Sequence, residues 1–512
     1  MEKKRILSLV LAALMLLSVL ALAACSDSGK KPDGSDTTAP AVTSPVADTT
    51  VPEVTTAPDP ALIDDLPKDV KFDGETFTVL SHDHGASAIS WQVIDIYTEE
   101  ENGERINDAV YARNLAMEER FGVKVQQQLE GTPSSVMQLA INSGSDEFSV
   151  YQTTVQNQAT AATSGWLVNL LKQEYMDFDK AWWDRSANSS LSFDGRMFYA
   201  IGDSQLNALR ATWAVFFNKK LIGDVSEIPN LYDVVREGKW TLDLLREYGQ
   251  KIQQDVDGDG QMTWKPGDSV DIFGLGLQDE VVLPLVLGTG EHLVTIENGT
   301  VNYNLGSDRI MTAMERVWGF LNEDNTWIVN ANRYSYTNLW IEFRNLFMQD
   351  QMGFFMGHLS TPVLIAGEMQ SDFGILPFPK VFEEQKEYYS TFQYNNAHAL
   401  SIPKTADLKK TPLLTEAYTM LSHDTVRPAF YDFTLTLRAS RDVDSGEMLD
   451  IIYSNRNLDL SLAYNGSTNL QSTLQGAATA GAFKFASTEA KLKPSLTKTM
   501  EKIVENLEKV DG

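Results

Sequence analysis

Short apolar runs alternate with helical patterns from Phe77 to Ile402, and this alternation constrains the fold more than any other feature of the sequence. The candidate strands are Phe77–Leu80, Val123–Val125, Phe148–Tyr151, Ala214–Phe217, Gly353–Met356, Phe373–Leu376 and Ala399–Ile402. Strands that are separated by helical stretches predict an α/β protein with mainly parallel sheets. In open sheets of this class, ligands bind beyond the carboxyl ends of the strands.

Two helices can be placed from their ends. One apolar face joins Ile106, Val110, Met117 and Phe121, and Gly122 is expected to end this helix. Thr241 is a candidate N-cap for a second helix, because a threonine side chain can accept a hydrogen bond from the first helical turn.

The first 24 residues have the layout of an export signal. A basic start, Lys3-Lys4-Arg5, precedes the apolar run Ile6–Ala24. A membrane-spanning helix is the alternative, because about 20 apolar residues can cross a bilayer. The segment ends in Leu22-Ala23-Ala24-Cys25, however, which resembles the lipobox of bacterial lipoproteins, where the cysteine is acylated and becomes the N-terminus.

The cysteine content supports this interpretation. Cys25 is the only cysteine in the 512 residues, so the chain cannot form an internal disulfide. Acylation gives this thiol a role, and a second acyl chain converts marginal membrane binding into stable anchoring. We therefore predict an exported protein that loses residues 1–24 and is held by lipid on Cys25 at the outer face of the cell membrane.

Residues 25–68 are predicted to form a disordered tether. Residues 26–60 consist mostly of Ser, Thr, Asp, Ala, Val and Pro, and no aromatic residue precedes Phe72. Such a segment cannot bury enough apolar surface to offset the entropy lost on ordering. A folded β-rich domain is the alternative, and the missing aromatic residues argue against it.

Charge limits the classes of partner. The formal net charge of the chain is −28, which disfavours nucleic acid and anionic lipid surfaces as partners and suits a neutral or cationic ligand.

The residues that follow the tether are enough for two or three domains. We expect the protein to be a monomer.

Several segments stand in a recognisable order along the body of the chain. They are Phe77–Val125, Gly165–Leu170, Trp182–Asp184, Met197–Ala200, Trp213–Lys219, Trp240–Asp243, Met352–Met356 and Phe373–Pro379. In this order they resemble the carbohydrate-type (family 1) extracellular solute-binding proteins of ABC importers, which have a type II periplasmic-binding fold. The resemblance covers roughly residues 70–405, and the last hundred residues match only as helices.

The resemblance implies two lobes with a ligand cleft between them. Crossovers near 210 and 400 and a return near 350 would assign 69–210 and 350–400 to the first lobe, and 211–349 and 401–512 to the second. The resemblance also implies a carbohydrate ligand, delivery to the transmembrane permease subunits of an ABC importer, and lobe closure on the ligand without covalent chemistry.

Aromatic and amide side chains at the expected cleft rim are candidate sugar contacts, because the C–H face of a sugar stacks on an aromatic ring. These candidates are Trp91, Asn157, Trp213, Phe355, His358, Tyr394 and Asn395. Trp213 is the best stacking candidate, because it begins a strand that should cross between the lobes. The alternative is that Trp213 packs inside a lobe, as we expect for Trp182 and Trp183.

An acidic segment resembles a calcium-binding loop. Asp255-Val-Asp257-Gly-Asp259-Gly260 matches the first half of an EF-hand loop, whose carboxylates bind Ca²⁺. The match fails at Pro266, where that loop needs a bidentate glutamate, and Asp268 or Asp271 could supply the missing carboxylate. We predict a structural Ca²⁺ site made of Asp255, Asp257, Asp259, Gln261 and Asp268. A solvated acidic turn is the alternative.

The sequence contains no HExxH, GxSxG or P-loop pattern. His82-Asp83-His84 comes nearest to a metal pair, and we interpret these histidines as bystanders. We therefore expect a binding protein and not an enzyme. Two alternative functions are a surface glycan hydrolase, which needs two carboxyl groups facing one cleft, and a non-transport receptor with the same fold.

Overall fold

The computed structural model describes residues 59–85, 89–268, 271–323, 325–365, 367–436 and 443–511. The export signal, Cys25 and most of the proposed tether lie outside these residues, so the expectations for them stay predictions. Within the described ranges, no helix is long and apolar enough to cross a membrane.

The first sheet has the strand order β11-β3-β1-β2. Its members are β1 (Thr76–His82), β2 (Lys124–Glu130), β3 (Val150–Thr154) and β11 (His398–Ser401). β1 pairs in parallel with β2 and β3, whereas β11 pairs antiparallel with β3. Phe77, Val79 and Leu80 are buried, so β1 contributes to the core from both faces of the sheet.

The helices of this half follow its strands. They are α2 (Arg105–Phe121), α3 (Pro133–Ser143), α4 (Val155–Thr163), α5 (Arg185–Leu191) and α6 (Leu206–Arg210), with short 3-10 helices η2 (Pro60–Leu62), η3 (Ile89–Trp91) and η4 (Leu170–Lys172). α2 ends as predicted, because Gly122 has a φ of 72° and donates its N–H to the carbonyl of Glu118. Glycine adopts this left-handed conformation without steric cost.

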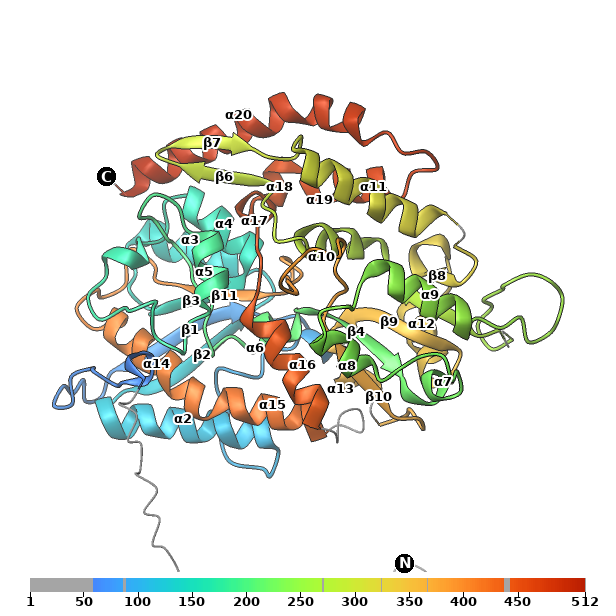
Figure 1. Ribbon diagram of the computed structural model, residues 1–512. Coiled ribbons are helices and arrows are strands. Elements are labelled where there is room, and N and C mark those ends of the chain that lie inside the picture. The colour runs from blue at the N-terminus through green and yellow to red at the C-terminus, as the bar shows by residue number, and fades with distance from the viewer. Residues whose placement is uncertain are drawn as a thin grey trace, which may run out of the picture. The chain divides into compact units, whose positions relative to one another are not determined.

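The second sheet has the strand order β10-β4-β9-β5-β8. Its members are β4 (Trp213–Asn218), β5 (Phe273–Leu277), β8 (Ile328–Asn330), β9 (Met352–His358) and β10 (Phe373–Leu376). β4 runs antiparallel to both β9 and β10, and β5 runs parallel to β8 and β9. In Figure 1, β1, β2, β3 and β11 gather on one side of the view and β4, β8, β9 and β10 on the other.

A longer set of elements surrounds the second sheet. The helices are α7 (Lys219–Gly223), α8 (Leu231–Arg236), α9 (Leu242–Ile252), η5 (Asp279–Val281), α10 (Val282–Leu287), α11 (Asp308–Asn322), η6 (Ala331–Arg333), α12 (Leu339–Met348) and α13 (Thr361–Ile365), and β6 (Val294–Glu297) with β7 (Thr300–Tyr303) forms a hairpin. Thr241 caps α9 as predicted, because its side chain accepts a hydrogen bond of 3.2 Å from the backbone N–H of Leu244.

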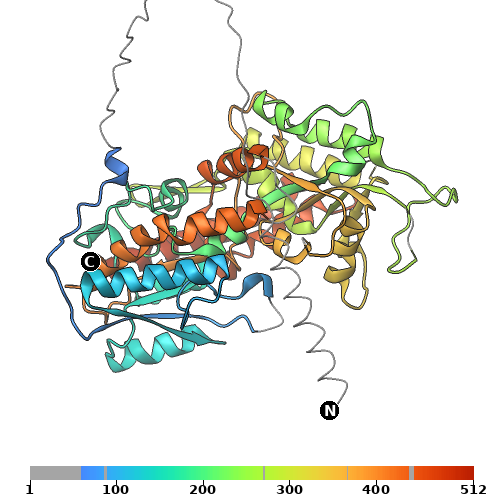
Figure 2. The same ribbon diagram turned by 90° about the horizontal axis from the view of Figure 1, so that it is seen from below.

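The C-terminal helices contact both halves. They are α14 (Thr411–Asp424), α15 (Val426–Thr436), α16 (Val443–Ser454), α17 (Leu460–Ala463), α18 (Asn465–Thr468), α19 (Leu470–Ala478) and α20 (Phe485–Asp511). α14 and α15 pack on α2, and Figures 1 and 2 both show α15 alongside α2. α16 contacts β10, and α20 contacts α4 of one half and β7 and α11 of the other.

The strand pairing corrects the expected division into lobes. Residues 350–400 were assigned to the first lobe, but β9 and β10 pair with β4 in the second sheet, and only β11 joins the first. Residues 401–512 were assigned to the second lobe, but α14 and α15 pack on α2 of the first. The expectation of mainly parallel sheets is also wrong for β4, β10 and β11, which have only antiparallel partners.

Candidate ligand-binding cleft

Two segments pass from one sheet to the other and are hydrogen-bonded to each other. The backbone N–H of Trp213 donates to the carbonyl of Thr391 over 3.0 Å, and that of Gln393 donates to Ala211 over 3.1 Å. The segment before β4 and the segment before β11 therefore lie side by side. They join the two halves of the protein and form part of the floor of a cleft.

The cleft is a cavity of about 380 Å³ at the carboxyl ends of parallel strands. Its lining combines a loop after β1, residues after β5, the end of β9, helices α12 and α13, and the segment before β11. The lining residues are Ser90, Trp91, Gln278, Glu280, Trp340, Phe343, Arg344, Phe355, Gly357, His358, Ser360, Thr361, Leu364, Gln393 and Asn396. Both halves of the protein contribute, as a ligand-induced closure requires.

Aromatic side chains supply most of the apolar surface of the cleft. Trp91 is half-buried, Trp340 is 44 % exposed, and Phe343 and Phe355 are buried. Trp91 packs edge-on against the imidazole of His358 with ring centroids 5.5 Å apart. Burial lowers the pKa of His358 to about 3, so this imidazole is neutral at physiological pH.

One acid and one base line the same cleft. Burial raises the pKa of Glu280, and its Oε2 is a buried atom with no hydrogen-bond partner among the described residues. Burial likewise lowers the pKa of the Arg344 guanidinium. A ligand with several hydroxyl groups could therefore donate to Glu280 Oε2 and accept from Arg344.

The predicted ligand residues divide into two groups. Trp91, Phe355 and His358 line the cleft, whereas Asn157, Trp213, Tyr394 and Asn395 do not. Trp213 is only 2 % exposed, because its indole lies behind the imidazole of His358 with ring centroids 3.9 Å apart. The alternative interpretation of Trp213, as a packing residue, therefore fits this structure.

Tyr394 and Asn157 also form hydrogen bonds within the protein. The Tyr394 hydroxyl accepts a 2.7 Å hydrogen bond from the backbone N–H of Asp459, and the Asn157 amide donates to Thr153 Oγ1 over 3.3 Å. Asn395 is exposed between two lining residues, Gln393 and Asn396.

Sequence reasoning missed the contributions of α12 and of the loop after β5. Trp340, Phe343 and Arg344 lie on a helix that no local motif connects to the first crossover. Glu280 follows β5, which is hard to recognise as a strand in the sequence because it contains Gly274 and Gly276. The one signal that could have identified it is the polar segment Gln278–Glu280 directly after an apolar run.

His82 and His84 meet His398, which is distant in sequence, at the first sheet. His84 Nε2 lies 3.1 Å from His398 Nε2, and the rings of His82 and His84 have centroids 4.2 Å apart. Burial lowers the pKa of His84 to about 4, and burial also lowers the pKa of His398 well below its usual value. A single N–H···N hydrogen bond between two neutral imidazoles accounts for the close contact.

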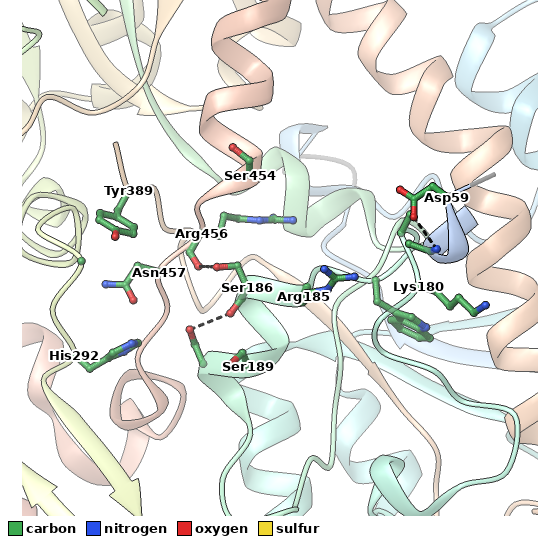
Figure 3. Close-up of a pocket in the computed structure, with 15 residues that line it drawn as sticks. Asp59, Lys180, Arg185, Ser186, Ser189, His292, Tyr389, Ser454, Arg456 and Asn457 are labelled. Carbon is green, nitrogen blue, oxygen red and sulfur yellow. Dashed lines mark hydrogen bonds between the residues drawn. The ribbon is translucent and has the colours of Figure 1, made fainter. Parts of the chain in front are cut away.

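A second and larger cavity shares no residue with the cleft. Its volume is about 850 Å³, and Figure 3 shows Tyr389, Asn457 and His292 on one side of it and Ser186, Ser189 and Arg185 on the other. The full lining is Asp59, Ala61, Lys180, Ala181, Trp183, Arg185, Ser186, Ser189, Ser190, Gly290, His292, Tyr389, Ser454, Arg456 and Asn457.

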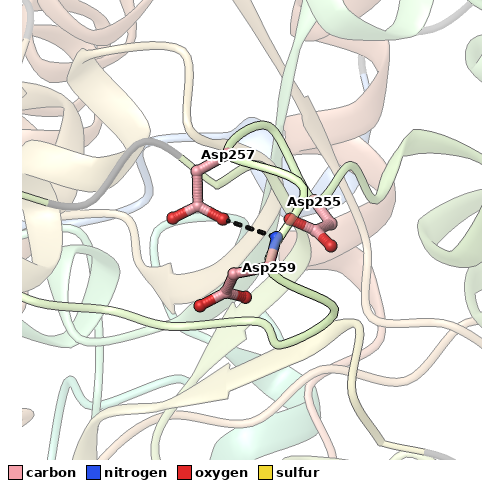
Figure 4. A group of neighbouring side chains, drawn as sticks. All are labelled: Asp255, Asp257 and Asp259. Carbon is pink, nitrogen blue, oxygen red and sulfur yellow. Dashed lines mark hydrogen bonds between the residues drawn. The ribbon is translucent and has the colours of Figure 1, made fainter.

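The acidic loop brings three carboxylates together. Oxygens of Asp255, Asp257 and Asp259 lie within 4.8 Å of one another on an exposed turn (Figure 4). Gly260 has a φ of 79° and donates its N–H to Asp255 Oδ2 over 2.7 Å, as the turn of a calcium loop requires. Three converging carboxylates suit a hard cation, so the donor set fits Ca²⁺.

The remaining predicted calcium ligands are arranged differently. Asp268 Oδ2 pairs with Lys265 Nζ at 2.5 Å and lies outside the group of three carboxylates. Gln261 joins the loop through its backbone N–H, which donates to Asp259 Oδ1 over 2.7 Å. The buried Asp271 accepts from the backbone N–H groups of Val256 and Thr263 and closes the loop.

Comparison with protein-family models and with curated protein sequences finds no match. Solved structures are similar over most of the chain. UspC from Mycobacterium tuberculosis aligns with a TM-score of 0.54 at 14 % identity, and the alignment covers 83 % of this chain and 100 % of that one. The chain has the fold of the solute-binding proteins.

Two further structures support the same fold. A sugar transporter from Rhizobium etli, solved in an open conformation, aligns with a TM-score of 0.51 at 12 % identity over 85 % of this chain and 99 % of that one. An extracellular solute-binding protein from Staphylococcus aureus, solved with maltose, aligns at 0.50 and 11 % identity over 86 % and 100 %. These likenesses confirm the predicted fold, a mixed α/β architecture like that of periplasmic-binding proteins.

Proposed function

We propose that the protein binds a neutral carbohydrate in its cleft and delivers it to the transmembrane subunits of an ABC importer. The observation that carries this proposal is the lining of the cleft, where Trp91 and Trp340 offer ring faces and Glu280 and Arg344 offer hydrogen-bonding groups. The solute-binding fold adds support, since the Staphylococcus aureus neighbour was solved with maltose.

The charges of the cleft favour a neutral sugar over a charged one. The described lining holds one acid, Glu280, and one guanidinium, Arg344, so it has no excess of either charge to attract a uronic acid or an amino sugar. A hydroxyl group can donate to Glu280 and accept from Arg344. We therefore expect neutral mono- or oligosaccharides to bind more tightly than their charged analogues.

Export and lipid attachment form part of the same proposal. A lipid anchor would keep the binding protein near its permease, and the lipobox-like segment Leu22–Cys25 would provide that anchor. The Thr- and Pro-rich residues that follow would give the folded part its reach.

A glycan hydrolase receives less support from the cleft. Glycoside hydrolysis uses two carboxyl groups on either side of the scissile bond. Glu280 is the single carboxylate among the described lining residues. The carboxylate of the neighbouring Asp279 accepts from the Asn330 amide over 2.8 Å. The backbone N–H of Asp279 donates to Asn332 Oδ1, also over 2.8 Å.

A thermal-shift screen tests the proposal. The purified protein is heated with neutral sugars, uronic acids and amino sugars, and neutral sugars should raise the melting temperature most because they bind the folded state. Trp91→Ala should abolish the rise. Trp166→Ala, which removes a half-buried indole outside the cleft, is the control and should leave it intact. A panel in which no neutral sugar raises the melting temperature would refute the proposal.

A further inference from the structure

Basic side chains outnumber acidic ones in the lining of the larger cavity, although the chain as a whole is acidic. The chain has 70 acidic and 42 basic residues, yet Lys180, Arg185 and Arg456 line this cavity against one acid among the described residues, Asp59. The Nζ of Lys180 is paired with Asp65 at 2.9 Å, so the two arginines are the cations that could hold a ligand. The Asp59 carboxylate caps helix η2, because it accepts a hydrogen bond from the backbone N–H of Ala61. A concave surface lined by one sign of charge concentrates ligands of the opposite sign.

Arg456 is held in position before any ligand arrives. Its guanidinium is 5 % exposed and forms an ion pair with Asp184, and its Nη1 donates to the carbonyl of Ala208 over 3.3 Å. Its Nε is a buried donor with no partner among the described residues. A buried arginine with an unused donor is a costly arrangement that a nearby acceptor would relieve.

Arg185 is exposed to solvent, in contrast to Arg456. Its side chain is 65 % exposed, and its ion pair with the Asp179 carboxylate, which is 91 % exposed, is long at 3.8 Å. Its Nη2 also donates to the carbonyl of Asp179 over 2.5 Å, in an exposed hydrogen bond. An exposed pair of this kind contributes little to stability, so Arg185 can exchange its partner for a ligand at small cost. The two arginines flank Ser186, whose hydroxyl donates to the carbonyl of Arg456 over 2.8 Å.

The opposite wall offers neutral hydrogen-bonding groups. The Asn457 amide nitrogen donates to the carbonyls of Leu287 and Glu291 over 2.9 and 3.0 Å, which fixes the orientation of the amide. His292 Nδ1 donates to the carbonyl of Leu458 over 3.0 Å, so in the neutral imidazole Nε2 is an acceptor. With the Tyr389 hydroxyl, this wall can both donate to and accept from hydroxyl groups.

We propose that this cavity is a second binding site, for a small molecule that carries an oxyanion and hydroxyl groups together. Arg185 and Arg456 would hold the oxyanion, because guanidinium groups match the geometry of phosphate and carboxylate oxygens. Asn457, His292 and Tyr389 would hold the hydroxyl groups. The site shares no residue with the cleft, so the inference does not depend on the proposed sugar site.

Calorimetric titration of the full chain tests the second site with three probes: glycerol 3-phosphate, inorganic phosphate and glycerol. Glycerol 3-phosphate should bind most tightly, and salt should weaken its binding. Arg185→Glu should lower its affinity at least about tenfold, since it replaces an attraction with a repulsion. Arg333→Glu is the matched control, because it makes the same charge change on an exposed residue outside both cavities.

A second variant tests the location of the site. Ser189 is exposed at the edge of the cavity, so Ser189→Trp should block the probe while the fold persists, as circular dichroism and the melting temperature would report. Three results would overturn the inference: no binding of any probe, equal affinity for glycerol and glycerol 3-phosphate, or equal losses in Arg185→Glu and Arg333→Glu.

Discussion

The indole of Trp213 packs behind the imidazole of His358, with ring centroids 3.9 Å apart, and His358 is the residue that reaches the cleft. The two residues are direct partners on the antiparallel strands β4 and β9. Trp213 also contacts Phe378 edge-on, with ring centroids 6.1 Å apart. The indole thus supports the cleft from within the core.

Trp213→Ala should therefore act mainly on stability. Removing a buried tryptophan costs about 3–5 kcal/mol of unfolding free energy, because a cavity remains. Urea denaturation measures this loss, and titration with the cleft ligand measures the affinity of the folded fraction. Trp213→Phe, which keeps a ring against His358, should recover most of the stability. A variant of normal stability that has lost ligand affinity would contradict the packing role.

Glu416 should make stability fall as pH rises. Its carboxylate is buried and accepts hydrogen bonds from the indole N–H groups of Trp182 and Trp183, over 2.7 and 3.0 Å. Burial is the largest influence and raises the pKa of Glu416 to about 8. Between about pH 4.5 and pH 8 the folded state keeps a proton that the unfolded state has lost, so stability decreases across this window.

Glu416→Gln should remove this pH dependence, because an amide does not ionise. Denaturation at several pH values should show the wild type losing stability relative to the variant as the pH approaches 8. Glu100→Gln is the control, since Glu100 is exposed and its substitution should leave the wild-type pH dependence intact. Parallel stability curves for wild type and Glu416→Gln would contradict the raised pKa.

Calcium should stabilise the loop of Asp255, Asp257 and Asp259. A ligand that binds only the folded state contributes about 2.7 kcal/mol at a hundredfold excess over its Kd. A chelator should therefore lower the melting temperature, and Asp257→Ala should remove that response. Asp268→Ala should retain it, because Asp268 pairs with Lys265 outside the group. If neither the chelator nor added Ca²⁺ changes the melting temperature, the loop is an ordinary acidic turn.

Cys25→Ser should abolish lipid attachment. The variant lacks the thiol that would be acylated, so the protein should accumulate as an uncleaved precursor or leave the detergent phase on phase partitioning. Wild-type protein should enter that phase. Unchanged partitioning of the variant would contradict the lipoprotein prediction.

Local elements were predictable because their signals lie within short stretches of sequence. The apolar runs that become β1, β4 and β9 and the glycine that ends α2 are examples. The glycine-rich β5 was not recognised as a strand, because its neighbours approach too closely for side chains. A Cβ on Gly274 would lie 2.2 Å from the carbonyl oxygen of Gly249, and one on Gly276 would lie 2.2 Å from the Met352 side chain.

Long-range pairing was less accessible from the sequence. Nothing local indicates that β9 and β10 pair with β4, which is more than a hundred residues earlier. The same limit applies to the cleft, where Trp91 and His358 could be proposed from strand ends but Trp340 and Arg344 could not. Their position depends on how α12 packs on the second sheet.

The most direct test of the account is a calorimetric titration of the intact protein with a neutral sugar found in the screen, followed by mass spectrometry of the recovered sugar. The account predicts one site per chain, a loss of at least about 2 kcal/mol, or roughly thirtyfold in affinity, in Trp91→Ala, and recovery of the sugar with its mass unchanged. A shortened sugar after incubation, or equal binding by wild type and Trp91→Ala, would contradict it.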